Sequence, residues 1–317
     1  MRNRSPGKLL LKIATMCTIL LAAHPAFSWE VWLSPNGPEA QHYQELLQSP
    51  AAWSDATKRV GVFKISTQFA VLASDAEFES FIEGTKRLNL KIAIEGLMLT
   101  STDRCGRQVE GYTGPAAILR AAQRIKKYGA KLSYIAMDSV LIFGHEYTGP
   151  KACRDSIDSL ARQVAEKVVQ ARSVFPDVEV GDIEPIGNPR PGWLEDIAAW
   201  TKAYQSATGT PLAFFDFDVD WSNPHWAQEL QSGARLMDSL HIPIAVTYNG
   251  SKREASSREW VAKAVEHFRV VEGQLNIHPQ FAVIQSWNPY PEKMIPETDP
   301  AALSFVAREY GRMHERD

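Results

Sequence analysis

The sequence is poor in the features that mark several common protein classes. Its 317 residues hold only three cysteines, and it has no C-x-x-C pair, no G-x-G-x-x-G or Walker loop and no G-x-S-x-G elbow. Dithiol redox sites, dinucleotide or nucleotide phosphate sites and serine-hydrolase elbows therefore lack their sequence signatures. A formal net charge of −3 also lacks the basic excess of a nucleic-acid-binding domain. With 44% hydrophobic and 22% charged residues, the composition is that of a globular protein.

The N-terminal segment differs from the rest of the chain. Four basic residues and no acidic residue accompany an uncharged apolar run at 13–23, which is too short to cross a bilayer. Ala26 and Ser28 provide the small-x-small pattern of a cleavage site before Trp29. We expect 1–28 to be a signal peptide, with the protein exported to the periplasm or the extracellular space and left without a stable membrane anchor after cleavage. The alternative is an uncleaved anchor helix.

The remaining chain, 29–317, is expected to form one domain. Loss of 1–28 removes four basic side chains and moves the formal charge to −7. Only Cys105 and Cys153 remain, and in an oxidising compartment such a pair favours a disulfide over a metal site or a reactive thiol.

Hydrophobic periodicity along this domain alternates between short β-rich runs and longer helical patterns, which is typical of parallel βα units. The expected strands are 31–34, 60–66, 91–97, 132–138, 178–184, 212–218, 242–248 and 281–287. The expected helices are 76–88, 116–128, 156–175, 194–207, 226–240, 258–271 and a last one that starts at Asp299 and Pro300. This count predicts an α/β fold, a single (β/α)8 TIM barrel. A doubly wound open sheet is the alternative.

Carboxylates follow four consecutive predicted strands. Alternate strand residues face the interior of a barrel, and chemistry is built at the carboxyl ends of the strands. The acids that this pattern places inward at strand ends are Glu95, Asp138, the pair Asp182 and Glu184, and the pair Asp216 and Asp218. Burial of several carboxylates in one mouth costs free energy unless they are paired or functional, so the set predicts an active site.

Two short motifs carry a family resemblance. Asp182-Ile-Glu184 resembles the D-x-E strand ends of barrel glycoside hydrolases, including the chitinase-like and lysozyme-like families. The alternating aspartates at 216, 218 and 220 are similar to those of the chitinase-like family but lack its terminal glutamate and preceding glycine. In the largest barrel glycosidase clan the nucleophile follows strand seven, where this chain has Tyr248-Asn249. The resemblance is therefore to secreted (β/α)8-barrel glycoside hydrolases in general, with no specific family.

Aromatic and amide side chains after the later strands fit a hydroxyl-rich ligand. Trp221 and Trp287 offer faces for stacking on sugar rings, and Tyr248, Asn249 and Gln285 offer hydrogen bonds to hydroxyls. With Glu95 and Asp216, these are the expected substrate-binding residues. The expected partner is an oligo- or polysaccharide, and no nucleic acid is expected.

These residues predict a glycoside hydrolase, which needs one protonated carboxyl and one ionised carboxylate. In this hypothesis Glu184 is the acid, Asp182 raises its proton affinity, and the partner carboxylate is Asp138 or Asp218. No cofactor is required. The first alternative is a metal-dependent sugar-isomerase-like barrel, in which Glu95, Asp138, Glu184 and Asp216 or Asp218 hold a divalent cation. The second alternative is a non-catalytic glycan-binding barrel.

Overall fold

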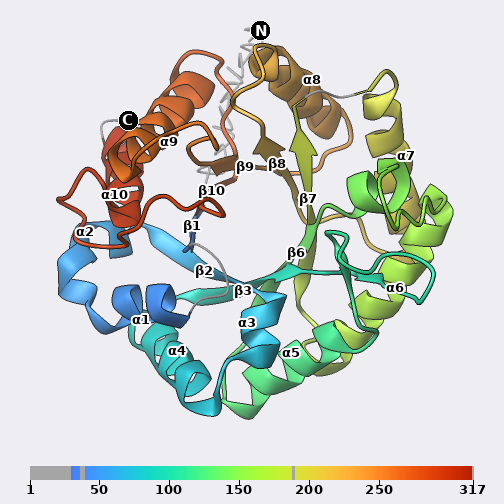
Figure 1. Cartoon of the computed structure of the whole chain (residues 1–317), viewed down its shortest axis with the longest axis horizontal. Coiled ribbons are helices and arrows are strands. Elements are labelled where there is room, and N and C mark those ends of the chain that lie inside the picture. Colours follow the sequence, from blue (N-terminus) through green and yellow to red (C-terminus); the bar gives the residue numbers. More distant parts are fainter. Residues whose placement is uncertain (1–29, 36–39, 188–189, 316–317) are drawn as a thin grey trace, which may run out of the picture.

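Eight parallel strands close into a barrel in the computed structural model, which describes residues 30–35, 40–187 and 190–315 (Figure 1). In order around the barrel the strands are β1 (Glu30–Ser34), β10 (Phe281–Gln285), β9 (Ile244–Tyr248), β8 (Phe215–Val219), β7 (Glu179–Ile186), β6 (Leu132–Asp138), β3 (Lys91–Gly96) and β2 (Val60–Ser66). The closed parallel barrel confirms the TIM-barrel prediction and excludes the doubly wound sheet. All eight predicted strands are present, and β2 and β6 have the predicted bounds.

Helices surround the barrel in Figure 1. They are α1 (Ala40–Gln48), α2 (Ser54–Thr57), α3 (Thr67–Leu72), α4 (Asp75–Arg87), α5 (Ala117–Lys127), α6 (Ile157–Val174), α7 (Trp193–Thr208), α8 (Trp226–Ser239), α9 (Ser257–Gly273) and α10 (Leu303–His314). The periodicity predicted α4 to α9 within a few residues of these bounds. It missed α1 to α3, which are short and lie close together in the chain.

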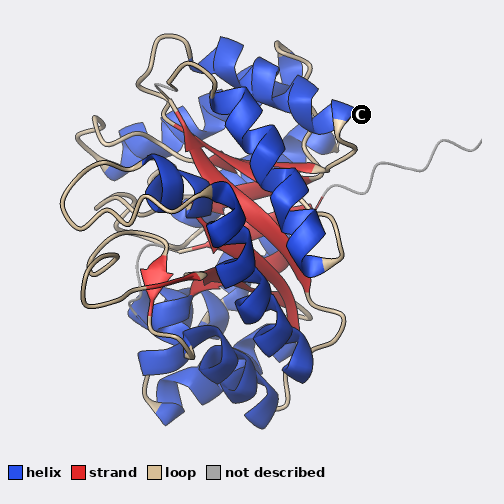
Figure 2. Ribbon diagram, turned by 90° about the vertical axis from the view of Figure 1, so that its right-hand side faces the viewer, coloured by secondary structure: helices blue, strands red, loops and turns tan. Residues whose placement is uncertain are grey.

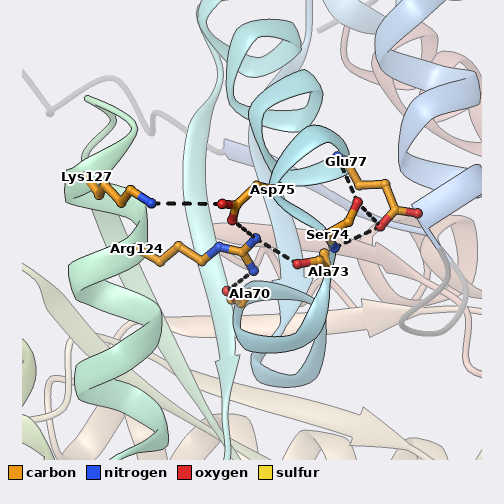
Figure 3. Close-up of polar contacts among 7 residues, drawn as sticks. All are labelled: Ala70, Ala73, Ser74, Asp75, Glu77, Arg124 and Lys127. Atoms are coloured by element: carbon orange, nitrogen blue, oxygen red, sulfur yellow. Dashed lines mark hydrogen bonds and ion pairs between the residues drawn. The ribbon is translucent and has the colours of Figure 1, made fainter.

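Local capping explains where several helices begin. Ser74 and Glu77 form a capping box at the start of α4, in which each side chain accepts a hydrogen bond from the other's backbone N–H (Figure 3). Arg124 of α5 joins this helix start to its neighbour, because its guanidinium donates to Ala73 O and pairs with Asp75 (Figure 3).

The predicted start of the last helix was wrong. Asp299 and Pro300 lie in a turn, where the Asp299 carboxylate accepts a hydrogen bond from the backbone N–H of Ala301. The chain becomes helical only after Ala302, which forms a parallel bridge with Lys293. The Asp299-Pro300 pattern thus stabilises a turn just before the helix and not the first turn of the helix itself.

Two apolar layers hold the barrel. Outward strand residues pack against the helices, while a smaller cluster fills the interior and includes four aromatic rings. Trp32 lies at its centre, with ring centroids 4.9 Å from Tyr134, 5.3 Å from Phe214 and 5.5 Å from Phe281. Because these rings fill the interior, polar inward residues are left to the carboxyl end of the strands.

Long connections gather at one side of the molecule, on the left in Figure 2. Two of them carry the predicted disulfide, which is confirmed: Cys105, between β3 and α5, is bonded to Cys153, between β6 and α6, with Cα atoms 5.1 Å apart. A short two-stranded sheet, β4 (Leu99–Thr100) with β5 (Tyr112–Thr113), and a π-helical turn at Ile142–Glu146 also belong to these connections.

The predicted signal peptide, 1–28, lies outside the described residues. Within the part of the chain that the structure describes, no helix is long and apolar enough to cross a membrane.

Candidate active site

Three of the predicted strand-end acids meet in one cavity at the carboxyl end of the barrel. Glu95 from β3, Asp138 from β6 and Asp218 from β8 line a cavity of about 280 Å³. Ala93 and Ala136, which precede two of these acids by two residues, belong to the interior cluster, so the inward parity predicted for β3 and β6 is confirmed. Phe214 confirms it for β8.

The inward parity predicted for β7 was wrong. Ile183 of this strand packs in the barrel interior, whereas Val180 packs with the helices, so Asp182 and Glu184 face out of the barrel. Asp182 is fully buried, and its Oδ2 accepts a hydrogen bond of 2.5 Å from the indole nitrogen of Trp200 on α7.

Glu184 is on the same outward face of β7 and is hydrogen-bonded to backbone groups. Its carboxylate accepts hydrogen bonds from the backbone N–H groups of Leu141, at 2.5 Å, and Ile142, at 3.1 Å. Burial and then the charge of Asp182 raise its pKa well above the usual value. Its contacts position the turn that follows β6.

A glycine explains why β7 is oriented this way. A Cβ on Gly181 would lie 2.4 Å from the ring of Phe214, so the inward position beside this ring accepts only a glycine. The sequence pattern predicts that the acids face inward, whereas the packing of Phe214 requires the inward set that contains Gly181 and Ile183.

A buried lysine below the cavity was missed. Lys64, an inward residue of β2, has no exposed surface and its Nζ lies 2.9 Å from Glu95 Oε2. Gln285 on β10 donates a hydrogen bond of 2.7 Å to the same oxygen. Neither contact uses Oε1 of Glu95. A lysine at an inward position of an apolar strand was the available sequence signal.

The acids of the cavity differ in proton affinity. Burial raises the pKa of Glu95, but the charge of Lys64 and the hydrogen bond from Gln285 outweigh burial and leave it below the usual value. Burial, then the charges of Glu95 and Glu110, raise the pKa of Asp138 well above normal. Burial, then the charge of Asp216, raise the pKa of Asp218 to about 8. At neutral pH the cavity therefore holds an ionised Glu95 beside a mostly protonated Asp218, and the proton affinity of Asp138 is raised.

A loop acid completes this group. Glu110 lines the same cavity, and burial followed by the charge of Glu95 raises its pKa. The next residue, Gly111, has φ +79° and passes so close to β6 that a Cβ would lie 2.9 Å from Asp138 O. The disulfide-bonded loop thus holds Glu110 beside Asp138.

Two other cavities lie beside it at this end of the barrel. One, of about 430 Å³, shares Asp218, Lys252 and Trp287 with it, and the second, of about 370 Å³, contains Glu184 and Trp193. Pro185, at the end of β7, lines all three. The central cavity and the one of about 430 Å³ together form a cleft, and Trp287, 41% exposed, lies where they meet.

The other predicted substrate-binding residues divide into three groups. Gln285 lines the central cavity and Asn249 the adjoining one. Asp216 is buried and accepts hydrogen bonds from Thr247 at 3.1 Å, while Trp221 is 8% exposed at the base of the adjoining cavity. The placement of Tyr248 was wrong: it faces out of the barrel with no exposed surface and donates to Glu272.

The predicted metal-ligand set is not brought together. Glu184 lies on the opposite side of the barrel wall from Glu95 and Asp138, and the ammonium group of Lys64 already provides a cation beside Glu95. Among the described residues, no group of three or more histidine, cysteine or acidic side chains has the arrangement of a metal site.

Comparison with known proteins supports the fold. No protein-family model matches the chain, and no characterised protein matches it by sequence. Among solved structures, an endo-1,4-β-xylanase from Caldicellulosiruptor owensensis is similar over 87% of this chain and 90% of its own, with 12% identity and a TM-score of 0.53. A fungal β-1,4-galactanase structure matches over 87% and 99%, with 9% identity and a TM-score of 0.53.

Another solved structure with a similar TM-score is that of an enzyme that is not a glycoside hydrolase. A truncated 3-deoxy-D-arabino-heptulosonate 7-phosphate synthase from Thermotoga maritima covers 91% of this chain and 87% of its own, with 10% identity and a TM-score of 0.51. The neighbours include TIM-barrel glycoside hydrolases, in keeping with the general resemblance seen in the sequence. At such identities the likeness shows the fold alone, so function has to be argued from the site.

Proposed function

We propose that this protein is an exported glycoside hydrolase that cleaves a polysaccharide within the cleft. The observation that carries the proposal is the pairing, in one cavity, of a Glu95 carboxylate kept ionised by Lys64 with Asp218, whose pKa of about 8 keeps it mostly protonated at neutral pH, and with Asp138, whose pKa is raised by burial. Hydrolysis of a glycosidic bond needs these two protonation states side by side. The exposed face of Trp287 adds a surface on which a sugar ring can stack.

The roles follow from charge. Glu95 is the base or nucleophile, and its Oε1 is the oxygen left free by Lys64 and Gln285. Asp138 or Asp218 is the general acid that protonates the leaving oxygen. Asp182 and Glu184 are positioning residues in this proposal, since they face out of the barrel and hold α7 and the turn after β6. The chemistry requires no cofactor.

The open cleft favours a polymer over a small sugar. The central cavity and the adjoining cavity of about 430 Å³ share Asp218, Lys252 and Trp287, so a chain can extend from the central carboxyls along the adjoining cavity. Ligand sites of this kind combine apolar surface with a few placed polar groups.

A reducing-end assay on a panel of polysaccharides tests the activity. Glu95→Gln is expected to lower the rate about 10²- to 10⁴-fold, the range for loss of a positioned acid or base. Aryl glycosides with good leaving groups separate the two candidate acids, because such substrates need little protonation. The variant, Asp138→Asn or Asp218→Asn, that loses activity on polysaccharide but keeps it on the aryl glycoside identifies the acid.

The same panel distinguishes the other two functions. Undiminished binding of a glycan without any release of reducing ends, by wild type and Glu95→Gln alike, would replace the enzyme with a glycan-binding barrel. Activity that is lost on chelation and restored by a divalent cation would favour the isomerase-like alternative. Asp55→Asn, on the exposed surface of α2, is the control for a general loss of charge.

A further inference from the structure

The adjoining cavity has one cationic wall. Lys252 and Arg253, in the loop between β9 and α9, line it together with Trp287. Both side chains are exposed, and in the part of the chain that the structure describes neither forms an ion pair or a side-chain hydrogen bond. Lys252 also lines the central cavity, where its charge lowers the pKa of Glu110.

The loop that carries these cations has a rigid base. The backbone carbonyl of Asn249 accepts a hydrogen bond of 2.7 Å from His267 Nδ1, and its side-chain oxygen accepts one of 2.6 Å from the indole nitrogen of Trp221. The rings of Trp221 and His267 are stacked with centroids 4.0 Å apart. This network fixes Asn249, so the loop that carries Lys252 and Arg253 begins from a defined backbone position.

The facing wall cancels only part of this charge. Asp218 is protonated at neutral pH, since its pKa is about 8. The Asp220 carboxylate lines the same cavity and accepts hydrogen bonds from both the backbone N–H and the hydroxyl of Ser222, which do not remove its charge, so two cations face one carboxylate. Two unpaired cations beside an aromatic face are the elements that bind an anionic sugar: stacking for the ring and charge-assisted hydrogen bonds for its acidic group.

We propose that the substrate is an anionic polysaccharide, whose acidic sugar lies on Trp287 in the subsite next to the cleaved bond with its anionic group between Lys252 and Arg253. The position of the cleaved bond rests on the proposed function, because it is set by Glu95, Asp138 and Asp218. The binding of the acidic sugar does not depend on the proposed function. Carboxylate and sulfate groups share the chemistry that this wall recognises, and the experiment separates them.

Binding is measured by calorimetry on wild type with polygalacturonate, its methyl-esterified form, a sulfated galactan and neutral xylan. Wild type is expected to bind an anionic glycan at least about tenfold more tightly than the neutral ones, the factor for one charged hydrogen bond. A preference for polygalacturonate identifies the anion as a carboxylate, and a preference for the sulfated galactan identifies it as a sulfate. Equal or tighter binding of neutral xylan would overturn the proposal.

A double variant tests the two cations. Lys252→Gln combined with Arg253→Gln is expected to weaken binding of the anionic glycan about 100-fold and to flatten its dependence on salt, because two charged contacts are lost. The matched control is Lys202→Gln with Arg235→Gln, which removes the same charge from exposed positions on α7 and α8 and is expected to bind as wild type does. Equal binding by both double variants would show that the wall is not the site.

The outcomes for this inference and for the proposed function are separable. Tight binding of an anionic glycan that depends on Lys252 and Arg253, without release of reducing ends, supports the inference and overturns the hydrolase. Hydrolysis of a neutral glycan by a protein that does not bind anionic ones supports the hydrolase and overturns the inference.

Discussion

Lys64 Nζ lies 2.9 Å from Glu95 Oε2 inside the barrel, and the lysine side chain has no exposed surface. A lysine in this position is expensive to bury unless it is paired, and Glu95 is its ion-pair partner. Lys64 lies in the barrel interior, and Glu95 lines the cavity above it. Glu95 therefore stays ionised in an environment that raises the pKa of its neighbours Asp138 and Asp218.

Replacement of Lys64 by methionine is the first test of this pair. Lys64→Met leaves the Glu95 carboxylate without its cation, which is expected to lower the free energy of unfolding by about 3 kcal/mol at neutral pH. The pKa of Glu95 is then expected to rise, since burial acts unopposed. Urea unfolding measures the first effect, and the acid limb of the pH–rate profile, which is expected to move to higher pH, measures the second.

The stability of wild type has a matching pH dependence. The pKa of Glu95 is lower in the folded than in the unfolded chain, so its contribution is present above the unfolded value and is lost as pH falls through the folded one. The Lys64→Met variant should not show this loss of stability as pH falls. Lys91→Met is the control, because Lys91 is half exposed and pairs with Glu30 at the other end of the barrel, where an effect below about 1 kcal/mol is expected.

Glu184 gives the second prediction. In Glu184→Gln the amide oxygen keeps one of the two hydrogen bonds from Leu141 and Ile142, but the amide N–H₂ cannot accept the other. The expected cost is about 1–3 kcal/mol of stability. Hydrolytic activity at a temperature where the variant is folded is expected to fall far less than in Glu95→Gln. An inactive variant as stable as wild type would contradict this and return Glu184 to the catalytic role that its motif first indicated.

The fold followed from periodicity because both layers of a TIM barrel have strong patterns in the sequence. Each strand is a short apolar run, and most of the helices are long enough to show their own period, as α4 and α6 do. The site residues could be predicted from the sequence only on strands whose inward face was unambiguous. On β3 the outward residues Ile92 and Ile94 left Glu95 no other direction than inward.

On β7 both faces were plausible, and the choice depended on Phe214, which is distant in sequence and fills the space beside Gly181. Donors supplied by other elements then made the outward acids tolerable: Trp200 for Asp182, and the backbone after β6 for Glu184. Such partners exist only in the folded chain. Lys64 was open to prediction by the same parity that identified the acids, whereas Lys252 lies in a loop that has no period to read.

Asp182 provides the third prediction, on pH and stability. Burial raises its pKa well above normal in the folded chain. Between the unfolded and folded values the unfolded chain binds fewer protons, so this group makes stability fall as pH rises. Asp182→Asn cannot ionise, and relative to wild type it is expected to become more stable as pH increases, with a gain in melting temperature of about 2 °C or more at neutral pH. Thermal unfolding from acid to alkaline pH measures the difference.

Asp177→Asn is the matched control for this series. Asp177 lies two residues before β7 and is largely exposed, so its replacement should leave the pH dependence of melting unchanged. A constant difference between Asp182→Asn and wild type at every pH would contradict the burial of an ionisable Asp182.

The disulfide carries the fourth prediction. Cys105 and Cys153 are 48 residues apart in sequence, and replacement of both by serine is expected to cost about 2–5 kcal/mol, because the unfolded chain is no longer constrained. The loop that holds Glu110 beside Asp138 should also loosen, which is expected to reduce activity even where the variant is fully folded. Urea unfolding and kcat under folded conditions measure the two effects. Wild type treated with a reductant should show the same changes, whereas the serine variant should not respond to it.

Asp216 and Asp218 lead to the last prediction, on the alkaline limb of activity. The pKa of Asp218 is about 8, raised by burial and then by the charge of Asp216. If Asp218 is the general acid, activity falls as pH rises through about 8, because the group loses the proton it must donate. Asp216→Asn removes the neighbouring charge, so the pKa of Asp218 falls and the alkaline limb is expected to move to lower pH. The pH dependence of kcat/KM measures the shift, and Asp238→Asn, an exposed replacement on α8, should leave it in place. A limb that does not move in Asp216→Asn would show that the two carboxyls are not coupled as their burial in one barrel mouth requires.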